Sequence, residues 1–344
     1  MKETAELLRN LIQIPSPSGK EQAISEYVTR RLRRSLVVLQ EDVGGGRANV
    51  LASLGTPKVV LTTHMDTVPG ELPCRLSAGR MYGRGACDAK GAMAAMILAA
   101  ESAAKKGVEG FALLLDVGEE TTFDGILAGM SGSVARLSPD MVVVGEPTSL
   151  RLLTGQRGLI HARMRTRGRA AHAALPEQGE CAITALCRLV ETVRAMPRAH
   201  DPLLGRSTVT VTRISGGSAS NVVADAAWAE LDIRTVPGDE HITAALRRLP
   251  TAQVDISCSF PPAICGDEHV IGRLARLLAQ KGLPSQPGFA PFFTEMRFWS
   301  EKAPAVILGP GNPAVAHSER EYVTVPEVET ASALYEEILM QFCP

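Results

Sequence analysis

Short apolar runs without alternation recur along the chain, at 59–63, 111–117, 140–145 and 304–309. Segments with helical apolar spacing separate them, among them an Ala-rich stretch at 91–106 and a final one at 325–342. Strands that are buried on both faces have such continuous runs, because helices cover both sides of a parallel sheet. The pattern therefore predicts an α/β fold whose mostly parallel sheet is covered by helices.

The pattern changes in the middle of the chain, where 207–214 and 226–236 alternate strictly between apolar and polar residues. Strict alternation predicts antiparallel strands with one buried face. The helix expected at 180–196 would cover that face with an apolar stripe: Ile183, Leu186, Leu189, Val190 and Val193. We therefore expect an α+β domain at 158–265 inserted into a discontinuous α/β domain of 1–157 and 266–344, with the chain re-entering through a helix near Asp267.

The composition argues against some classes of partner and of cellular location. The 344 residues carry 36 Lys and Arg against 37 Asp and Glu, a net charge of −1, and aromatic residues make up only 4%. This balance favours neither nucleic acid nor an anionic membrane surface as a partner. The seven cysteines form no C-x-x-C pair, and the first ten residues lack the apolar core of a signal peptide. We expect a cytoplasmic protein with reduced thiols.

Polar residues follow each apolar run of the α/β domain. They are His64, Asp66, Asp88, Glu119, Glu120, Glu146 and His317. Sites in open α/β sheets form beyond the carboxyl ends of the strands, so these side chains are predicted to meet in one crevice. So many carboxylates repel one another unless a cation lies between them. Histidine with carboxylate suits zinc, cobalt or manganese rather than calcium, and there are enough ligands for two ions.

Each of these segments has a simpler interpretation when taken alone. His64 and Asp66 could mark an ordinary strand end, and the Glu119–Glu120 pair could be a solvated surface pair. The Gly-rich loop at 83–91 could cradle a phosphate, but it lacks the third glycine of a dinucleotide loop and the ending of a P-loop. Their common position at strand ends favours the metal site.

The chain also resembles the M20 family of dinuclear metallo-aminoacylases and exopeptidases, and within it the branch of acetylornithine deacetylase and succinyl-diaminopimelate desuccinylase. The motifs that carry the resemblance span almost the whole chain: HMDTVPG, GRGACDAKGAMAAM, GEE, VVGEPTSL, GRAAHAALPEQGECAI, GGSASNVVADAAWAELDIR and GPGNPAVAHSEREYV. Glu295, which stands where desuccinylases have serine-aspartate, favours the acetylornithine side.

The resemblance implies a role for each residue at the strand ends. His64, Asp88 and Glu146 would hold one metal, with Asp88 bridging to a second that Glu120 and His317 complete. Glu119 would be the general base. Asp66 would orient His64, since a ligating imidazole usually donates its other N–H to a carboxylate. The residues alone leave open which of the adjacent glutamates binds metal.

The resemblance further implies that the inserted domain is a lid and dimerisation domain. His172 would polarise the carbonyl oxygen of the substrate, in cis or from the partner of a homodimer. Asn221, Arg234, Thr294 and Arg297 match substrate-binding positions, although a turn residue and a surface residue are simpler interpretations of the first two.

The expected activity is hydrolysis of the amide bond of an N-acyl amino acid, a small molecule, by an acetylornithine deacetylase-like enzyme with two divalent metal ions. Zinc is expected, with cobalt or manganese as alternatives. A desuccinylase, a hydrolase of a carrier-linked N-acyl diamino acid and a dipeptidase remain alternatives within the family. A further alternative is a homologue that binds metal but does not catalyse hydrolysis.

Overall fold

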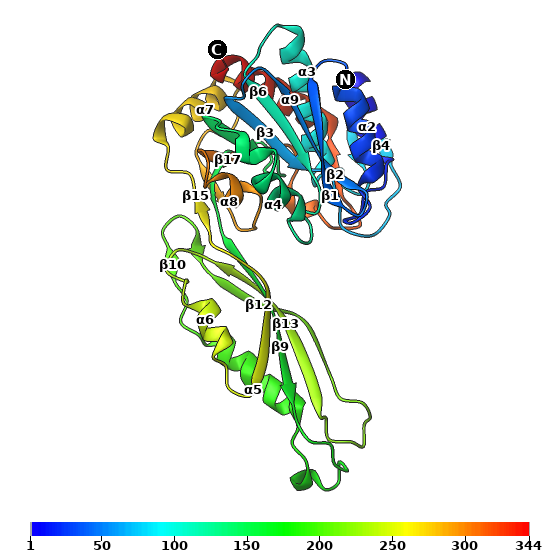
Figure 1. The fold of residues 1–344 in the computed structure, drawn as a ribbon, viewed down its shortest axis with the longest axis vertical. Helices are drawn as coiled ribbons and strands as arrows, with labels where there is room; N and C mark the ends of the chain where they lie inside the picture. The colour runs from blue at the N-terminus through cyan, green and yellow to red at the C-terminus, as the bar shows by residue number, and fades with distance from the viewer. Residues whose placement is uncertain (1, 344) are drawn as a thin grey trace. The chain divides into compact units, whose positions relative to one another are not determined.

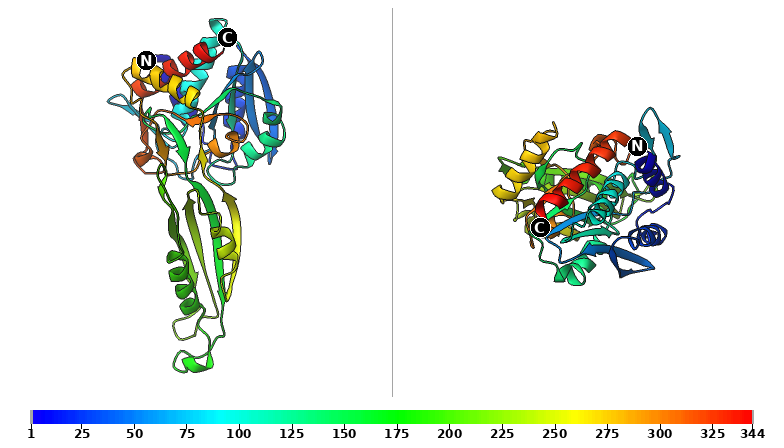
Figure 2. Two further views of the ribbon diagram at one scale, coloured as in Figure 1. Left: turned by 90° about the vertical axis from the view of Figure 1, so that its left-hand side faces the viewer. Right: turned by 90° about the horizontal axis from the view of Figure 1, so that it is seen from above.

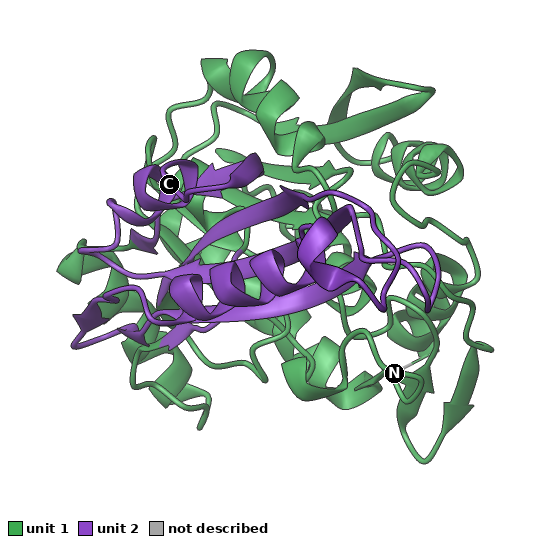
Figure 3. Ribbon diagram, turned by 90° about the horizontal axis from the view of Figure 1, so that it is seen from below, with its two compact units in different colours: residues 1–154, 264–288, 294–344 green, residues 155–263, 289–293 purple. Residues whose placement is uncertain are grey.

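The structure, a computed structural model, describes residues 2–343 and divides into two compact units. Unit 1 comprises 1–154, 264–288 and 294–344, and unit 2 comprises 155–263 with 289–293 (Figure 3). The insertion expected at 158–265 thus lies within two or three residues of the limits of unit 2. The return of 289–293 to unit 2 has no counterpart in the apolar pattern of the sequence.

A mostly parallel sheet at the centre of unit 1 is the fold that the apolar runs predict (Figure 1). Its order is β1-β2-β6-β3-β7-β17-β8-β15, with β16 beside β8. The strands are β1 (Val37–Gly44), β2 (Arg47–Leu54), β3 (Val59–His64), β6 (Phe111–Asp116), β7 (Met141–Val144), β8 (Leu153–Gln156), β15 (Ala263–Ile264), β16 (Gly288–Ala290) and β17 (Ala305–Ile307). The central strands β6, β3, β7 and β17 run parallel, whereas β1 and β2 add an antiparallel edge.

The central strands are apolar throughout because both faces of the sheet are covered. Every residue of β3, β6 and β7 is buried. The helices of this unit are α1 (Lys2–Ile12), α2 (Gln22–Leu32), α3 (Lys90–Lys105), α4 (Asp124–Ser131), α7 (Glu268–Gln280), α8 (Met296–Trp299) and α9 (Val325–Phe342). The Ala-rich α3 packs on β3 and β6 and lies beside α9, as Figure 2 shows from above. Its small side chains allow this close approach.

Short elements complete unit 1. A small sheet has the order β18-β5-β4, with β18 (Tyr322–Thr324), β5 (Arg80–Tyr82) and β4 (Arg75–Ser77). Single 3-10 turns lie at Val134–Arg136 and Pro313–Val315. The helix expected near Asp267 is α7, and the Asp267 carboxylate caps it by accepting the backbone N–H of Val270 at 2.9 Å. No helix within 2–343 is long and apolar enough to cross a membrane.

Unit 2 is an antiparallel sheet of order β12-β13-β9-β14 with helices on one face. Its elements are β9 (Gly158–Arg167), α5 (Ala182–Arg194), β10 (His200–Asp201), β11 (Gly205–Arg206), β12 (Thr208–Gly216), β13 (Ala226–Thr235), α6 (Ile242–Arg247), β14 (Ala252–Phe260) and a 3-10 turn at Pro176–Gln178. The alternation predicted for β13 is confirmed, since alternate residues Ala227 to Ile233 are buried.

One residue of the predicted helix stripe is not in this core. Ile183 is 39% exposed, whereas Leu186, Leu189 and Val193 are buried. Ile183 lies in the first turn of α5 beside Gly216 and Gly217. Because glycines carry no side chain, nothing there covers the isoleucine.

Candidate metal centre

His64 ends β3 and lies at the centre of a cluster of acidic groups in unit 1. Its ring is 1% exposed. Nδ1 lies 3.0 Å from the carbonyl oxygen of Asp66 and 3.3 Å from its Oδ1, while Nε2 lies 3.0 Å from Oδ1 of Asp88. Burial opposes protonation, but the hydrogen bonds to Asp66 and Asp88 outweigh it and raise the pKa of His64. Contacts at both ring nitrogens thus fix the orientation of the imidazole.

The Asp66 carboxylate joins His64 to the loop that carries the two adjacent glutamates. Oδ1 accepts the backbone N–H of Glu119 and Oδ2 that of Glu120, both at 3.1 Å. Oδ2 also accepts the Ser18 hydroxyl at 2.6 Å. Asp66 is fully buried, which opposes ionisation, yet the hydrogen bonds from His64, Ser18 and Glu120 lower the pKa of its carboxyl. A fixed anion therefore connects β3 to the loop after β6.

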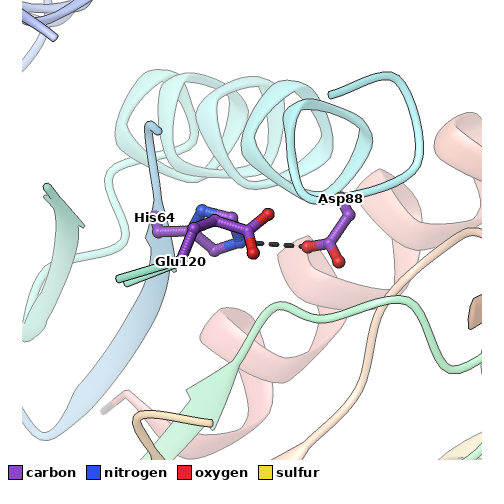
Figure 4. A group of neighbouring side chains, drawn as sticks. All are labelled: His64, Asp88 and Glu120. Atoms are coloured by element: carbon purple, nitrogen blue, oxygen red, sulfur yellow. Dashed lines mark hydrogen bonds and ion pairs between the residues drawn. The ribbon is translucent and has the colours of Figure 1, made fainter. Parts of the chain in front are cut away.

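Asp88 lies between the two histidines. Its Oδ1 faces His64 Nε2, and its Oδ2 lies 3.2 Å from His317 Nε2, which is also 2.9 Å from Oε1 of Glu120. Contacts with Asp88 and Glu120 raise the pKa of His317 to about 10. His64, Asp88 and Glu120 offer ligand atoms that all lie within 4.8 Å of one another (Figure 4). A carboxylate between two imidazoles is a suitable bridge between two cations.

The remaining carboxylates at the strand ends are crowded. Burial raises the pKa of Glu119, and burial together with nearby Asp88 raises that of Glu146. Glu146 is 5% exposed, and its buried Oε1 accepts no hydrogen bond from the described residues. Buried carboxylates without donors are costly unless a cation binds them. The set of oxygen and imidazole donors fits a divalent cation, and His64, Asp88 and Glu120 are the three whose ligand atoms lie together. Glu146 and His317 as further ligands remain a prediction.

Two further residues, Glu321 and Arg84, support Asp88, and the sequence analysis missed both. Glu321 is 1% exposed and accepts the backbone N–H groups of Cys87 and Asp88 at 3.1 and 3.2 Å. Arg84 pairs with its other oxygen at 2.7 Å. The signal in the sequence was their position inside two of the quoted motifs: Arg84 lies four residues before Asp88, and Glu321 four residues after His317.

The candidate substrate residues of unit 2 lie in two places. His172 and Asn221 are in neighbouring loops, since the Asn221 carbonyl accepts the N–H of Ala173, and His172 Nδ1 accepts the N–H of Ala174. Arg234 lies on β13, where Nε and a terminal nitrogen bind Asp232 at 2.8 and 2.9 Å.

Thr294 and Arg297 bond within their own helical segment in unit 1. Thr294 is buried, and its hydroxyl accepts the Met296 N–H at 3.1 Å, while Arg297 pairs with Glu301 at 2.5 Å. Glu295 between them is 1% exposed and accepts the Thr62 hydroxyl at 3.3 Å. These contacts stabilise α8 and its junction with β3.

The α/β sheet, the inserted unit and the cluster of His64, Asp88 and Glu120 are features expected of a metal-dependent hydrolase. A sequence profile described as peptidase family M20/M25/M40 matches residues 60–341. The chain therefore belongs to this family, as the motifs predicted.

The chain is also similar to individual proteins, two of which are named as M20 proteins. A peptidase M20 domain-containing protein of Schizosaccharomyces pombe is 31% identical over 97% of this chain and 83% of its own length. A putative LysW-lysine/LysW-ornithine hydrolase of Pyrobaculum aerophilum is 32% identical over 96% of this chain and 95% of its own. An M20 family metallo-carboxypeptidase of Sulfolobus solfataricus has the same fold, with a TM-score of 0.83, 17% identity and 99% coverage of both chains.

Proposed function

We propose that the protein hydrolyses the amide bond of an N-acyl amino acid and releases a carboxylate and a free amine, as an acetylornithine deacetylase-like enzyme. The observation that carries this proposal is Asp88, which lies between His64 and His317, with Glu120 beside His317. Two divalent ions, zinc or in its place cobalt or manganese, would supply a water activated near neutral pH and a polarised carbonyl.

Glu119 is the proposed general base. Its backbone N–H is bound by Asp66, so its position is fixed relative to His64. A carboxylate held beside the metal ligands can take a proton from the attacking water and return it to the leaving amine. His172 is proposed to polarise the substrate carbonyl oxygen, and Asn221 and Arg234 to bind substrate, within a homodimer.

A second candidate is the release of a diamino acid from a carrier protein. It is favoured by the Pyrobaculum relative, which matches this chain over nearly the full length of both and whose name gives LysW-lysine and LysW-ornithine. Both candidates break an amide with the same groups and differ only in what lies beyond the acyl carbon. A dipeptidase or carboxypeptidase activity is tested by the same experiment.

The test is hydrolysis by protein stripped of metal and restored with zinc or cobalt. The substrates are N-acetylornithine, N-succinyl-diaminopimelate, simple dipeptides and carrier-linked lysine. Metal-dependent release of one amine is expected. Glu119→Gln should lower kcat by about 10²- to 10⁴-fold with metal content unchanged, because it removes only the base.

Glu120→Gln is the matched variant, since it changes the adjacent glutamate. It should lower the affinity for metal as well as the activity, because Glu120 is assigned as a ligand. If Glu119→Gln loses metal and Glu120→Gln keeps it, the two roles are reversed. Bound metal without turnover of any substrate would refute the proposed hydrolysis.

A further inference from the structure

A segment near the N-terminus pairs with the exit of β3. Thr67 donates its N–H to the Ser16 carbonyl at 2.9 Å, and Ser18 donates its N–H to the Thr67 carbonyl at 3.2 Å. The Ser16 hydroxyl donates to the carbonyl of Met65 at 2.8 Å. Residues 15–19, which we call the Ser-Pro strap, therefore lie beside 65–67, with Pro17 and Thr67 in a parallel bridge before the chain turns at 18–19. Pro15 and Pro17 favour extended backbone for the residues before them, and Gly19 turns the chain with a φ of +91°.

The strap brings one hydroxyl onto the carboxylate that supports the metal centre. The 2.6 Å distance from Ser18 Oγ to Asp66 Oδ2 is in the range of a charge-assisted hydrogen bond. The only other donor to this oxygen among the described contacts is the N–H of Glu120. The Ser18 hydroxyl is thus the one side-chain donor that fixes this half of the carboxylate.

The orientation of this carboxylate affects both proposed metal positions. Oδ1 is shared by His64 Nδ1 and the N–H of Glu119, and Oδ2 holds the N–H of Glu120. A rotation of the Asp66 side chain therefore disturbs a ligand of each ion together. Partners behind the ligands of a metal typically change its affinity by about 10- to 100-fold.

We propose that Ser18 is a positioning residue of the metal centre, whose hydroxyl fixes the Asp66 carboxylate and through it His64 and the Glu119–Glu120 loop. This inference rests on the metal site of the proposed function. It assigns a role to the PSPSG segment, which the sequence analysis had not connected with the site. The competing interpretation is that Ser18 only attaches the strap to β3.

Ser16 provides the matched control. Its hydroxyl lies in the same strap, two residues away, and makes one hydrogen bond to the exit of β3. Its acceptor is a backbone carbonyl rather than the Asp66 carboxylate. Ser16→Ala therefore removes one side-chain attachment of the strap and leaves the carboxylate with all its donors.

The experiment is a cobalt titration of the metal-free full-length protein against a competing chelator, with the visible absorption of bound Co²⁺ as a second readout. Ser18→Ala is expected to weaken cobalt binding by about tenfold or more and to shift the absorption bands. Ser18→Thr, which keeps the hydroxyl, should restore both, and Ser16→Ala should match the wild type in both. Thermal unfolding of the metal-free variants shows that each is folded.

The outcomes separate this inference from the proposed function. If Ser18→Ala binds cobalt as the wild type does, or if Ser16→Ala weakens binding equally, the positioning role is wrong while the metal site stands. If the wild-type protein itself binds no cobalt, the proposed function fails and the inference with it.

Discussion

Replacement of Glu321 is the most informative change outside the ligand set. Its buried carboxylate accepts two backbone N–H groups, from Cys87 and Asp88, and pairs with Arg84. Glu321→Ala removes all three interactions, and Glu321→Gln keeps an acceptor for the N–H groups but loses the charge. The two variants therefore separate support of the backbone from pairing with the arginine.

The expected losses of folding free energy follow from the burial of the Arg84–Glu321 pair. The side chains of Arg84 and Glu321 are 16% and 1% exposed, so water cannot replace the lost partner. Removing one member of a buried pair costs about 3–5 kcal/mol, part of which is the two unsatisfied N–H groups. We expect about 4 kcal/mol for Glu321→Ala. A hydrogen bond to a charged group is worth about 1.5–3 kcal/mol, so we expect about 2 kcal/mol for Glu321→Gln.

Urea unfolding of the metal-free protein measures these values. The buried Trp299 reports on unit 1 by fluorescence. Glu319→Gln is the control, because it removes a glutamate from the same loop where the side chain is exposed, and it should change the free energy of unfolding by less than about 0.5 kcal/mol. Metal affinity should fall about 10- to 100-fold for Glu321→Ala, since the backbone of Asp88 loses its anchor.

Two results would refute this reasoning. Equal free energies of unfolding for Glu321→Ala and the wild type would show that the buried pair contributes nothing to the folded state. A loss of stability without any loss of metal affinity would show that the Glu321 carboxylate does not position Asp88.

Two further predictions concern a glycine behind the ligand loop and a histidine of unit 2. A Cβ at Gly125 would overlap the backbone of Val117, so Gly125→Ala should lower the free energy of unfolding in urea by about 1–3 kcal/mol, and an unchanged free energy would contradict the close packing. A hydrogen bond to Asp232 raises the pKa of His161 to about 9 from an ordinary value of 6.5. This stabilisation is present below pH 6.5 and is lost as the pH rises through about 9. Because His161 is half-exposed the loss should be about 1 kcal/mol or less, and His161→Asn, followed by Trp228 fluorescence, should abolish it.

The central sheet could be predicted because the apolar pattern of a buried strand lies within the strand itself. A strand buried on both faces requires an apolar run, and β3, β6 and β7 each have one. The parallel order then brings the ends of these strands together. That is why His64, Asp88 and Glu120 could be grouped before any geometry was known, although the first and the last of them are 56 positions apart.

The supporting contacts could not be predicted in this way. Ser18 meets Asp66 across 48 residues, and Glu321 meets the Asp88 N–H across 233. Each contact joins an irregular loop to a backbone or carboxylate group, so no periodicity marks it. Thr294 makes a local contact that the motif did not indicate, because its hydroxyl accepts the Met296 N–H, and its role in substrate binding stays a prediction.

The position of β17 has a consequence for how the protein is made on the ribosome. The strand, Ala305–Ile307, lies between β7 and β8, and both of these precede the four-stranded antiparallel sheet of unit 2 in the chain. A nascent chain that has just emerged through unit 2 therefore lacks the strand that joins the two sides of the central sheet. It also lacks His317 and Glu321. Unit 2 can form early from its own neighbouring strands, whereas the metal centre can be completed only after synthesis passes residue 321.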